Sequence, residues 1–218
     1  MIRPTTGRIP LAALAVALAA ASSSLYATTY TLEPDYTQGV FRWNHLGFST
    51  PAAQFAQGEG TLEFDEADPT RASVRVTIPL KTLSTGVPAL DEDFRSGDFF
   101  ATDQFPTAVF RSTRVKGNGS NQLEVTGELS LHGMTKTIML EVTIVKVGNN
   151  PRTGLPTVGF DATTTLNRSD FGLGRYVPQV SDAIQMHITS QAVEAKPYAE
   201  YLKAKAAEQA AAKGATKK

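Results

Sequence analysis

The segment GELSLHGMTKTIMLEV, residues 127–142, has the pattern of two β-strands joined by a tight turn. Apolar and polar residues alternate on both sides of His132-Gly133, and the glycine provides the backbone freedom that a hairpin bend requires. Alternation with a period of two indicates a strand with one apolar and one polar face. The segment therefore predicts an antiparallel hairpin. The histidine at its tip is a metal ligand, a catalytic base or only a turn residue.

The same alternation continues along most of the chain. It predicts strands at residues 39–45, 58–64, 72–78, 107–115, 121–131, 135–147, 157–166 and 181–194. The connections carry turn sequences such as DEADPT, KGNGSN and GNNPRTG. An all-β fold with an eight-stranded antiparallel barrel is favoured, because closing a meander of long strands removes its unpaired edges. A β-sandwich is the alternative.

One connection is much longer than the others. Residues 80–106, between the third and fourth predicted strands, contain PALDEDFRS, which predicts a short helix that ends at Gly97. The same connection carries the phenylalanines Phe94, Phe99, Phe100 and Phe105. A long connection of this kind is often a lid or binding loop. The alternative is that the rings simply plug one end of the barrel.

The two ends of the chain differ from the body at residues 28–195. Residues 1–27 combine Arg3 and Arg8 with the apolar run LAALAVALAAA and the small-residue sequence SSSLYA, which predicts a signal peptide cleaved after Ala27. The apolar run is too short to span a bilayer. The expected location of the mature protein is the periplasm. Residues 196–218 are rich in lysine and alanine and predict a helical or disordered tail.

Composition excludes several kinds of function. The chain has 21 basic and 21 acidic residues, and the body carries a net charge of −6, which argues against nucleic acid as a partner. There is no cysteine and no G-x-S-x-G motif, so neither common nucleophile motif is present. His45, His132 and His187 lack metal-binding spacing. Acidic residues in DEDFRSGD are interpreted as a solvated face. The sequence predicts no catalytic residue and no metal.

The apolar face of the predicted barrel mixes large and very small residues. Phe41, Trp43, Phe64 and Phe110 share it with glycine and alanine at residues 39, 58, 60, 72 and 108. A barrel of about eight strands is just wide enough for packed side chains or for one small ligand. The alternation alone leaves both interpretations open, because interdigitating large and small residues also fill a core.

Several segments in order resemble one known family. VFRWNHLGFST (residues 40–50), GEGTLEFDEADPTRASVRVTI (58–78), FRSGDFFATDQFPTAVFRSTRV (94–115) and GELSLHGMTKTIMLEVT (127–143) are similar to successive motifs of the YceI-like family of secreted bacterial proteins. RSDFGLG (168–174) and SDAIQMHITSQAVEA (181–195) fit the end of the family pattern. The resemblance covers residues 29–195.

This resemblance implies an extended lipocalin-like barrel that holds a long amphipathic isoprenoid lipid, either a polyprenyl chain or an isoprenoid quinone, without a cofactor. It implies a periplasmic carrier, with a role in stress protection as a further expectation. Carried over by motif, the ligand-binding residues are Phe41, Trp43, His45, Leu62, Phe64, Arg95, Phe99, Phe100, Phe110, Leu129 and Leu131. Arg95 and His45 are the polar candidates for contact with the head group. His132 is interpreted as a structural hairpin residue.

The sequence departs from the family pattern at three positions. Tyr36 replaces a usual histidine, Gly39 replaces a β-branched residue, and Trp43 replaces a smaller aliphatic one. These changes alter the expected shape of the pocket. Two other functions remain open: an enzyme acting on such a lipid through Arg95, Asp98 and His45, and an interaction module that assists a membrane redox protein. A second copy of the chain and a membrane surface are further candidate partners.

Overall fold

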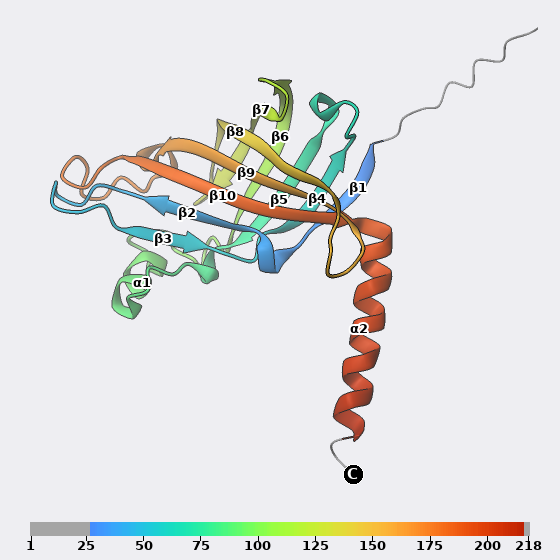
Figure 1. The fold of residues 1–218 in the computed structure, drawn as a ribbon. Helices are drawn as coiled ribbons and strands as arrows, with labels where there is room; N and C mark the ends of the chain where they lie inside the picture. Colours follow the sequence, from blue (N-terminus) through green and yellow to red (C-terminus); the bar gives the residue numbers. More distant parts are fainter. Residues whose placement is uncertain (1–26, 216–218) are drawn as a thin grey trace, which may run out of the picture.

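The structure is a computed structural model that describes residues 27–215 (Figure 1). The signal peptide expected at residues 1–27 therefore lies outside the described residues except for Ala27, and so do residues 216–218 of the tail. The strands are β1 (Thr28–Leu32), β2 (Gln38–Arg42), β3 (Ala52–Phe55), β4 (Glu59–Phe64), β5 (Ser73–Pro79), β6 (Thr107–Gly117), β7 (Gln122–Leu131), β8 (Met134–Asn149), β9 (Pro156–Asn167) and β10 (Ala183–Glu194).

Two α-helices and four short 3-10 turns complete the described chain. The helices are α1 (Pro88–Arg95), between β5 and β6, and α2 (Ala195–Ala215), after β10. The turns are η1 (Pro34–Tyr36), η2 (Pro69–Arg71), η3 (Leu80–Thr82) and η4 (Arg168–Phe171). The predicted insertion between the third and fourth expected strands thus contains the helix α1, and the predicted tail is the helix α2.

Eight antiparallel strands close into a barrel. Their order is β1-β4-β5-β6-β7-β8-β9-β10, and β10 returns to β1 through pairs such as Tyr30 with Glu194. Further along β10, Ile188 pairs with Gly39 of β2, and β3 pairs with the other edge of β2. The β2–β3 hairpin therefore extends the wall beyond the closed ring (Figure 1). The expected all-β eight-stranded barrel is confirmed, and the sandwich alternative is excluded.

The first part of the chain differs from the strand prediction. The first expected strand, residues 39–45, corresponds to β2, which ends at Arg42, whereas closure depends on β1, which the sequence pattern did not predict. β3 was also missed, because AAQF is too short to show alternation. The helix α1 lies within the predicted segment PALDEDFRS and ends at Arg95; Ser96 is its C-cap, with its N–H bonded to the carbonyls of Glu92 and Asp93, so Gly97 directly follows the cap as expected.

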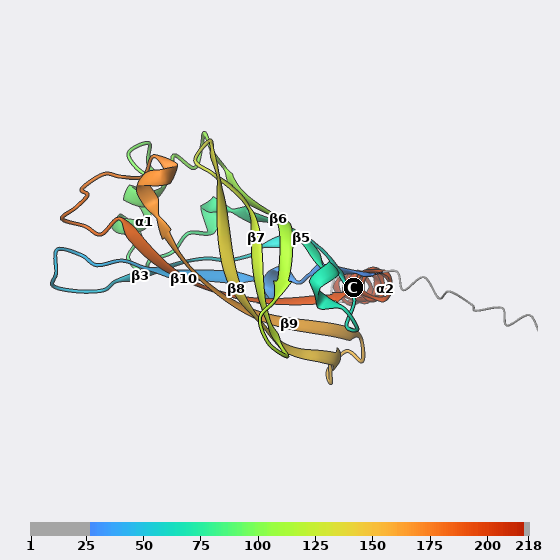
Figure 2. The same ribbon diagram turned by 90° about the horizontal axis from the view of Figure 1, so that it is seen from above.

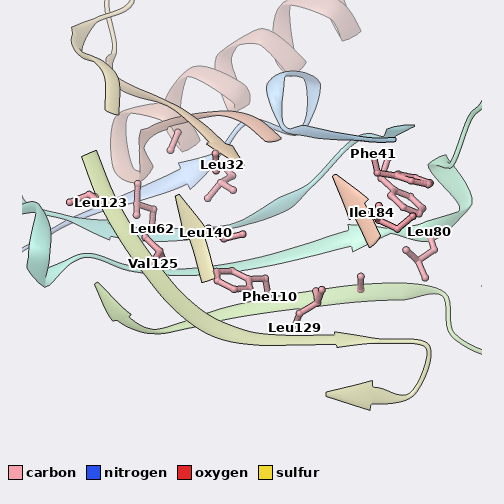
Figure 3. Close-up of a cluster of buried hydrophobic side chains, with 14 of the residues drawn as sticks. Leu32, Phe41, Leu62, Leu80, Phe110, Leu123, Val125, Leu129, Leu140 and Ile184 are labelled. Carbon is pink, nitrogen blue, oxygen red and sulfur yellow. The ribbon is translucent and has the colours of Figure 1, made fainter. Parts of the chain in front are cut away.

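The alternating residues form one apolar core inside the barrel. Buried side chains from different strands converge there, and Figure 3 shows Leu62, Val125, Phe110 and Leu129 projecting into the same interior space. At Gly127 of β7 the ring of Phe110 fills the place that a side chain would occupy. Strand glycines of this type allow close approach of a neighbour.

The helix α2 leaves the barrel at the end of β10 and projects away from it (Figure 1). Its first turns contact β1 and β10, and Tyr198 is half-buried there. From residue 202 to residue 213 every side chain is exposed. Across residues 27–215, the structure has no helix that is both long enough and apolar enough to cross a membrane.

Candidate functional site

The barrel contains an inner cavity of about 200 Å³. All ten strands contribute to its lining, and none of the lining side chains is charged. The apolar lining includes Leu62, Phe64, Phe110, Leu129, Leu140 and Phe160. Three of the hydroxyl groups at its wall are engaged: Thr37 and Ser190 bond each other at 3.0 Å, and Ser112 accepts from the N–H of Val74 at 2.9 Å. The cavity therefore favours an apolar occupant.

A second cavity of about 500 Å³ lies at the end of the barrel where the long insertion folds back. We call it the mouth cavity. Its wall is built from aromatic rings that contact one another, with centroids 5.7 Å apart for Phe41 and Trp43 and 5.4 Å apart for Phe55 and Phe100. Phe94 packs on Trp43 at 5.4 Å. Aromatic rings at these centroid distances pack favourably against one another and give the mouth cavity a wall with a large apolar area.

The two cavities adjoin each other. Four residues line both: Phe55, Leu131, Leu166 and Met186. The mouth cavity and the inner cavity are therefore separated only by these four side chains. Two adjoining, largely apolar cavities suit a molecule with a long apolar chain better than a compact polar one, because an apolar lining leaves polar groups of a ligand unpaired.

Hydrogen bonds from side chains of α1 join the helix to the preceding part of the insertion beside the mouth cavity. The carboxylate of Asp91 accepts from the N–H and the hydroxyl of Thr85, both at 2.6 Å, and these bonds lower the pKa of Asp91. Arg95 donates to the carbonyl of Leu83 at 2.9 Å and lies 3.7 Å from Asp91. The charged groups of α1 thus fix the helix to the segment that precedes it in the insertion, and Arg95 lines neither cavity.

Residues 168–182 form the opposite side of the mouth. Arg168 donates to the carbonyls of Ser181, Leu173 and Val180. Burial lowers the pKa of Arg168, and its guanidinium remains fixed by these three carbonyls. Arg168 is therefore a structural group of the loop that lines the mouth cavity, with its hydrogen-bonding capacity largely used.

Two contacts join the loop to the insertion across the mouth. Arg175 forms an ion pair with Asp98, and the hydrogen bonds to Tyr176 and Asp98 raise the pKa of Arg175. The ring of Phe99 lies 6.4 Å from that of Tyr176. Both charged partners are substantially exposed, so this ion pair contributes little to stability. It nevertheless narrows the end of the barrel.

The structure brings together most residues that the family resemblance implied. The mouth cavity is lined by Phe41, Trp43, His45, Phe99 and Phe100, the inner cavity by Leu62, Phe64, Phe110 and Leu129, and both by Leu131. His45 lies at the rim, because its side chain is exposed while it still borders the mouth cavity. Arg95 is the residue of that set that the structure places elsewhere.

Several lining residues were not identified from the sequence. Phe171 and Leu173 reach the mouth cavity from η4 and the following loop, and Ile184 and Met186 reach it from β10. The β10 pair follows the same period of two as the other strands, so alternation could have placed it inward. Phe171 and Leu173 had a weaker signal, two apolar residues within the glycine-containing segment RSDFGLG.

The histidine at the tip of the β7–β8 hairpin has a structural partner. Its ring Nδ1–H donates to the carbonyl of Phe171 at 3.0 Å, and its ring packs on Phe105 with centroids 4.8 Å apart. His132 therefore ties the hairpin tip to η4 and to the insertion. Within residues 27–215, no three histidine or acidic side chains gather as a group that could hold a metal ion.

The chain is similar to known proteins both in sequence and in structure. Residues 30–192 match the model of the YceI-like domain. A UPF0312 protein of Pseudomonas syringae pathovar tomato is 34% identical over 189 residues, which cover 85% of this chain and 97% of that protein. The crystal structure of a YceI protein from Campylobacter jejuni aligns with a TM-score of 0.64 and 25% identity, covering 70% of this chain and 90% of that one.

A more distant structure shares the fold. It is described as a polyisoprenoid binding domain from Saccharophagus degradans implicated in plant cell wall breakdown. It aligns with a TM-score of 0.59 at 14% identity over 77% of this chain and 99% of that chain. The family model, the relatives and the solved structures agree with the motifs and with the closed barrel. This chain therefore belongs to the YceI-like domain family.

Proposed function

We propose that the protein binds a long amphipathic isoprenoid lipid, a polyprenyl chain or an isoprenoid quinone, inside its barrel and acts as a periplasmic carrier. The observation that supports this proposal is the apolar space formed by the mouth cavity and the inner cavity, which adjoin at Phe55, Leu131, Leu166 and Met186. The polyisoprenoid-binding neighbour, which has the same fold, adds support. The periplasmic location rests on the signal peptide expected from the sequence.

The energetics favour binding through the chain of such a lipid. Each buried CH₂ group contributes about 0.8 kcal/mol. Ordering costs offset part of that gain, and measured affinities saturate near about 18–21 kcal/mol. A chain that fills even part of the space is therefore held without any polar network. His45, at the rim, is the polar group that the proposal assigns to the head group.

Binding without turnover is part of the proposal. Arg95, one of the three residues considered for an enzyme, is bonded to Leu83 and lies next to Asp91, and Asp98 is paired with Arg175. These partners support positional roles for both charges. The exposed tip of the β2–β3 hairpin, with Phe48 92% exposed next to Leu46, supports transient contact with a membrane surface. Pairing with a second copy and a role in stress protection stay predictions.

The first test is to identify what the protein carries. The mature chain is purified from the periplasm, and native and denaturing mass spectra are compared with an organic extract of the same sample. We expect a stoichiometric lipid that belongs to a series spaced by one isoprene unit. An empty protein that also takes up no added ubiquinone or polyprenol would overturn the proposal.

The single tryptophan gives the second test its signal. Trp43 lines the mouth cavity, so a ubiquinone with a farnesyl tail should quench its fluorescence on binding. Gly39 lines the inner cavity, and an added Cβ would lie 3.7 Å from Ile188, an ordinary contact. The series Gly39→Ala, Gly39→Val and Gly39→Leu therefore fills the space stepwise without forcing the backbone apart.

Affinity for the farnesyl probe should fall along this series. Each CH₂ group displaced from the apolar space removes about 0.8 kcal/mol, so Gly39→Leu should weaken binding at least about tenfold. Gly97→Leu is the matched control, because Gly97 borders neither cavity and an added Cβ there meets nothing within 4 Å. Equal affinity across the Gly39 series would contradict chain binding in the inner cavity.

A further inference from the structure

The wall of the barrel is split between β8 and β9. Their ladder runs from Asn149 paired with Pro156 to Glu141 paired with Thr163, and it stops there although both strands continue. Residues 134–140 of β8 and 164–167 of β9 face this gap, which we call the β8–β9 window. Figure 2 shows the two strands running together at one end and diverging towards the other, and Figure 1 shows the same divergence.

The window is a built feature of the fold. On its far side β8 stays paired with β7 as far as Met134 with Leu131, and β9 stays paired with β10 as far as Asn167 with Ala183. The strands that border the gap are therefore held in place by their other neighbours. Regular pairing on the outer edges together with an interrupted ladder between them defines an opening in the wall rather than a frayed end.

Both ends of the window are fastened. At one end stands the last β8–β9 pair, Glu141 with Thr163. At the other end the His132 ring donates to the carbonyl of Phe171, 3.0 Å away. Between them, the hydroxyl of Thr164 donates to the carbonyl of Met139 at 2.8 Å, and this bond joins the strands by one side chain. A single hydroxyl bond contributes only about 1 kcal/mol and opens readily.

A cleft of about 980 Å³ lies over this gap. Its lips are polar and exposed, with Lys136, Glu141 and the threonines at 163 and 165. Its floor is apolar, because Leu166 and Met186 line this cleft, the mouth cavity and the inner cavity alike. Ile138 lines both the cleft and the inner cavity, and Phe171 lines both the cleft and the mouth cavity, so these four side chains separate the outside cleft from the interior space. Met186 is unbranched and flexible, which makes such a separation easy to open.

We propose that the β8–β9 window is the side entrance through which the chain of the lipid enters and leaves the barrel. This inference rests on the proposed function and adds its route. The end of the barrel is narrowed by the Asp98–Arg175 ion pair and by the Phe99 and Tyr176 rings. The window instead offers polar lips that a head group can pass on its way to the interior and an apolar floor over which a chain can slide. Movement of Ile138, Leu166 and Met186, with opening of the Thr164–Met139 bond, admits the chain without breaking a strand pair.

The experiment closes the window after folding. The chain has no cysteine, so two introduced thiols are the only ones present. In Met139→Cys/Thr165→Cys, the two exposed positions lie on opposite lips of the window. A short bismaleimide joins them in the folded protein. The uncrosslinked double variant is its own control, and stopped-flow quenching of Trp43 by farnesyl-tailed ubiquinone measures uptake.

Two further pairs show where the route runs. Thr143→Cys/Asp161→Cys places the same crosslink on a paired rung within the β8–β9 ladder, at residues that line none of the three cavities, and leaves the window open. Asp98→Cys/Arg175→Cys places it across the mouth. We expect the window crosslink to slow uptake by about tenfold or more, because binding that requires a change of conformation is slower. Each of the other two crosslinks should leave the rate of uptake equal to that of its own uncrosslinked variant. Protein filled before crosslinking should also retain the quinone when mixed with empty phosphatidylcholine vesicles.

The outcomes are separable. Uptake and release through a crosslinked window at the rates of the uncrosslinked variant would overturn the inference, and slowing by the mouth crosslink alone would move the route to the mouth. Neither result affects the proposed function, because the uncrosslinked protein still binds the probe. Absence of quenching in the unmodified protein would instead count against the proposed function itself.

Discussion

Gly127 on β7 shows how one missing side chain shapes the interior. The ring of Phe110 and the backbone carbonyl oxygen of Arg111, both from the neighbouring strand, lie where a Cβ would stand. Gly127→Ala should therefore push Phe110 away or part the two strands, and overpacking of this kind costs about 1–3 kcal/mol. Urea unfolding of the variant measures the loss of free energy of unfolding.

Gly97→Ala is the control for this prediction. An added Cβ at Gly97 meets nothing within 4 Å, and its φ is not in the left-handed region. Its stability should not fall, since a methyl group there only restricts the unfolded chain. Equal unfolding midpoints for the two alanine variants would show that Phe110 moves aside at no cost.

Glu33 carries a pH dependence of stability. It lies between β1 and η1, where burial is the main cause that raises its pKa, with repulsion from Asp35 next; a bond from Tyr198 of α2 opposes both. A raised pKa means that the fold favours the protonated form. The stability from Glu33 is thus present below the ordinary glutamate pKa of about 4.3 and is lost as pH rises through the raised value.

Glu33→Gln should remove this dependence. The variant should gain stability relative to the unmodified protein as pH rises from about 4 towards neutral, because a neutral amide avoids the buried charge. Unfolding in urea at several pH values measures the difference between the two proteins. Asp91 and Asp182, whose pKa values are lowered by bonds from Thr85 and Ser169, cancel in that difference. Parallel curves for the two proteins would rule out the assigned role of Glu33.

At the scale of single residues, some site residues could be predicted from the sequence and others could not. Motif positions on regular strands, such as Phe64 and Phe110, line the interior because a strand's alternation fixes which face a residue takes. Arg95 could not be placed in the same way. Its direction depends on the carbonyl of Leu83 and on Asp91, contacts that arise only when the insertion folds back.

At the scale of elements, α2 is a helix with two unequal parts. Tyr198 is half-buried beside Glu33 and stacks on Tyr201 with centroids 6.5 Å apart, whereas the side chains of residues 202–213 are exposed. Ending the chain after Lys203 should change the free energy of unfolding by no more than about 1 kcal/mol, because the side chains lost are exposed and the contact of Lys205 with the Tyr201 ring is a weak one. The helical signal in circular dichroism should decrease at the same time.

A chain ended after Ala195 is the matched comparison. It also removes Tyr198 and Tyr201, so it should unfold at lower urea concentration than the chain ended after Lys203. If both truncations left stability unchanged, the contact between α2 and the barrel would carry no stabilising energy.

The two strands that were not predicted from the sequence, β1 and β3, show the least alternation of apolar and polar residues. β1 has only five residues and follows directly on the expected cleavage site, and β3 has four. Each is defined by its partners, β10 and β4 for β1 and β2 for β3, and such long-range pairing leaves no periodic signal. The long strands β6 to β10 were predictable because they repeat the alternation many times.

At the scale of the whole molecule, the barrel was predictable and its openings were not. Eight strands with alternating apolar and polar residues must either close into a barrel or protect their edges by packing. The family motifs favour the barrel over the sandwich. The window depends on where the β8–β9 ladder stops, at Glu141 and Thr163. The flanking residues alternate regularly on both strands, so nothing in the pattern marks the interruption.

The closing of the barrel by its last strand also sets the order of folding. β10 pairs with β9, β1 and β2, so three of the contacts between strands wait until Glu194 has been synthesised. The run from β6 to β9 consists of neighbouring hairpins and can form from local contacts alone. Pairing residues near the two ends of a chain loses much chain entropy before any contact is gained, which slows folding. The barrel of the nascent protein therefore stays open until β10, its last strand, has been synthesised.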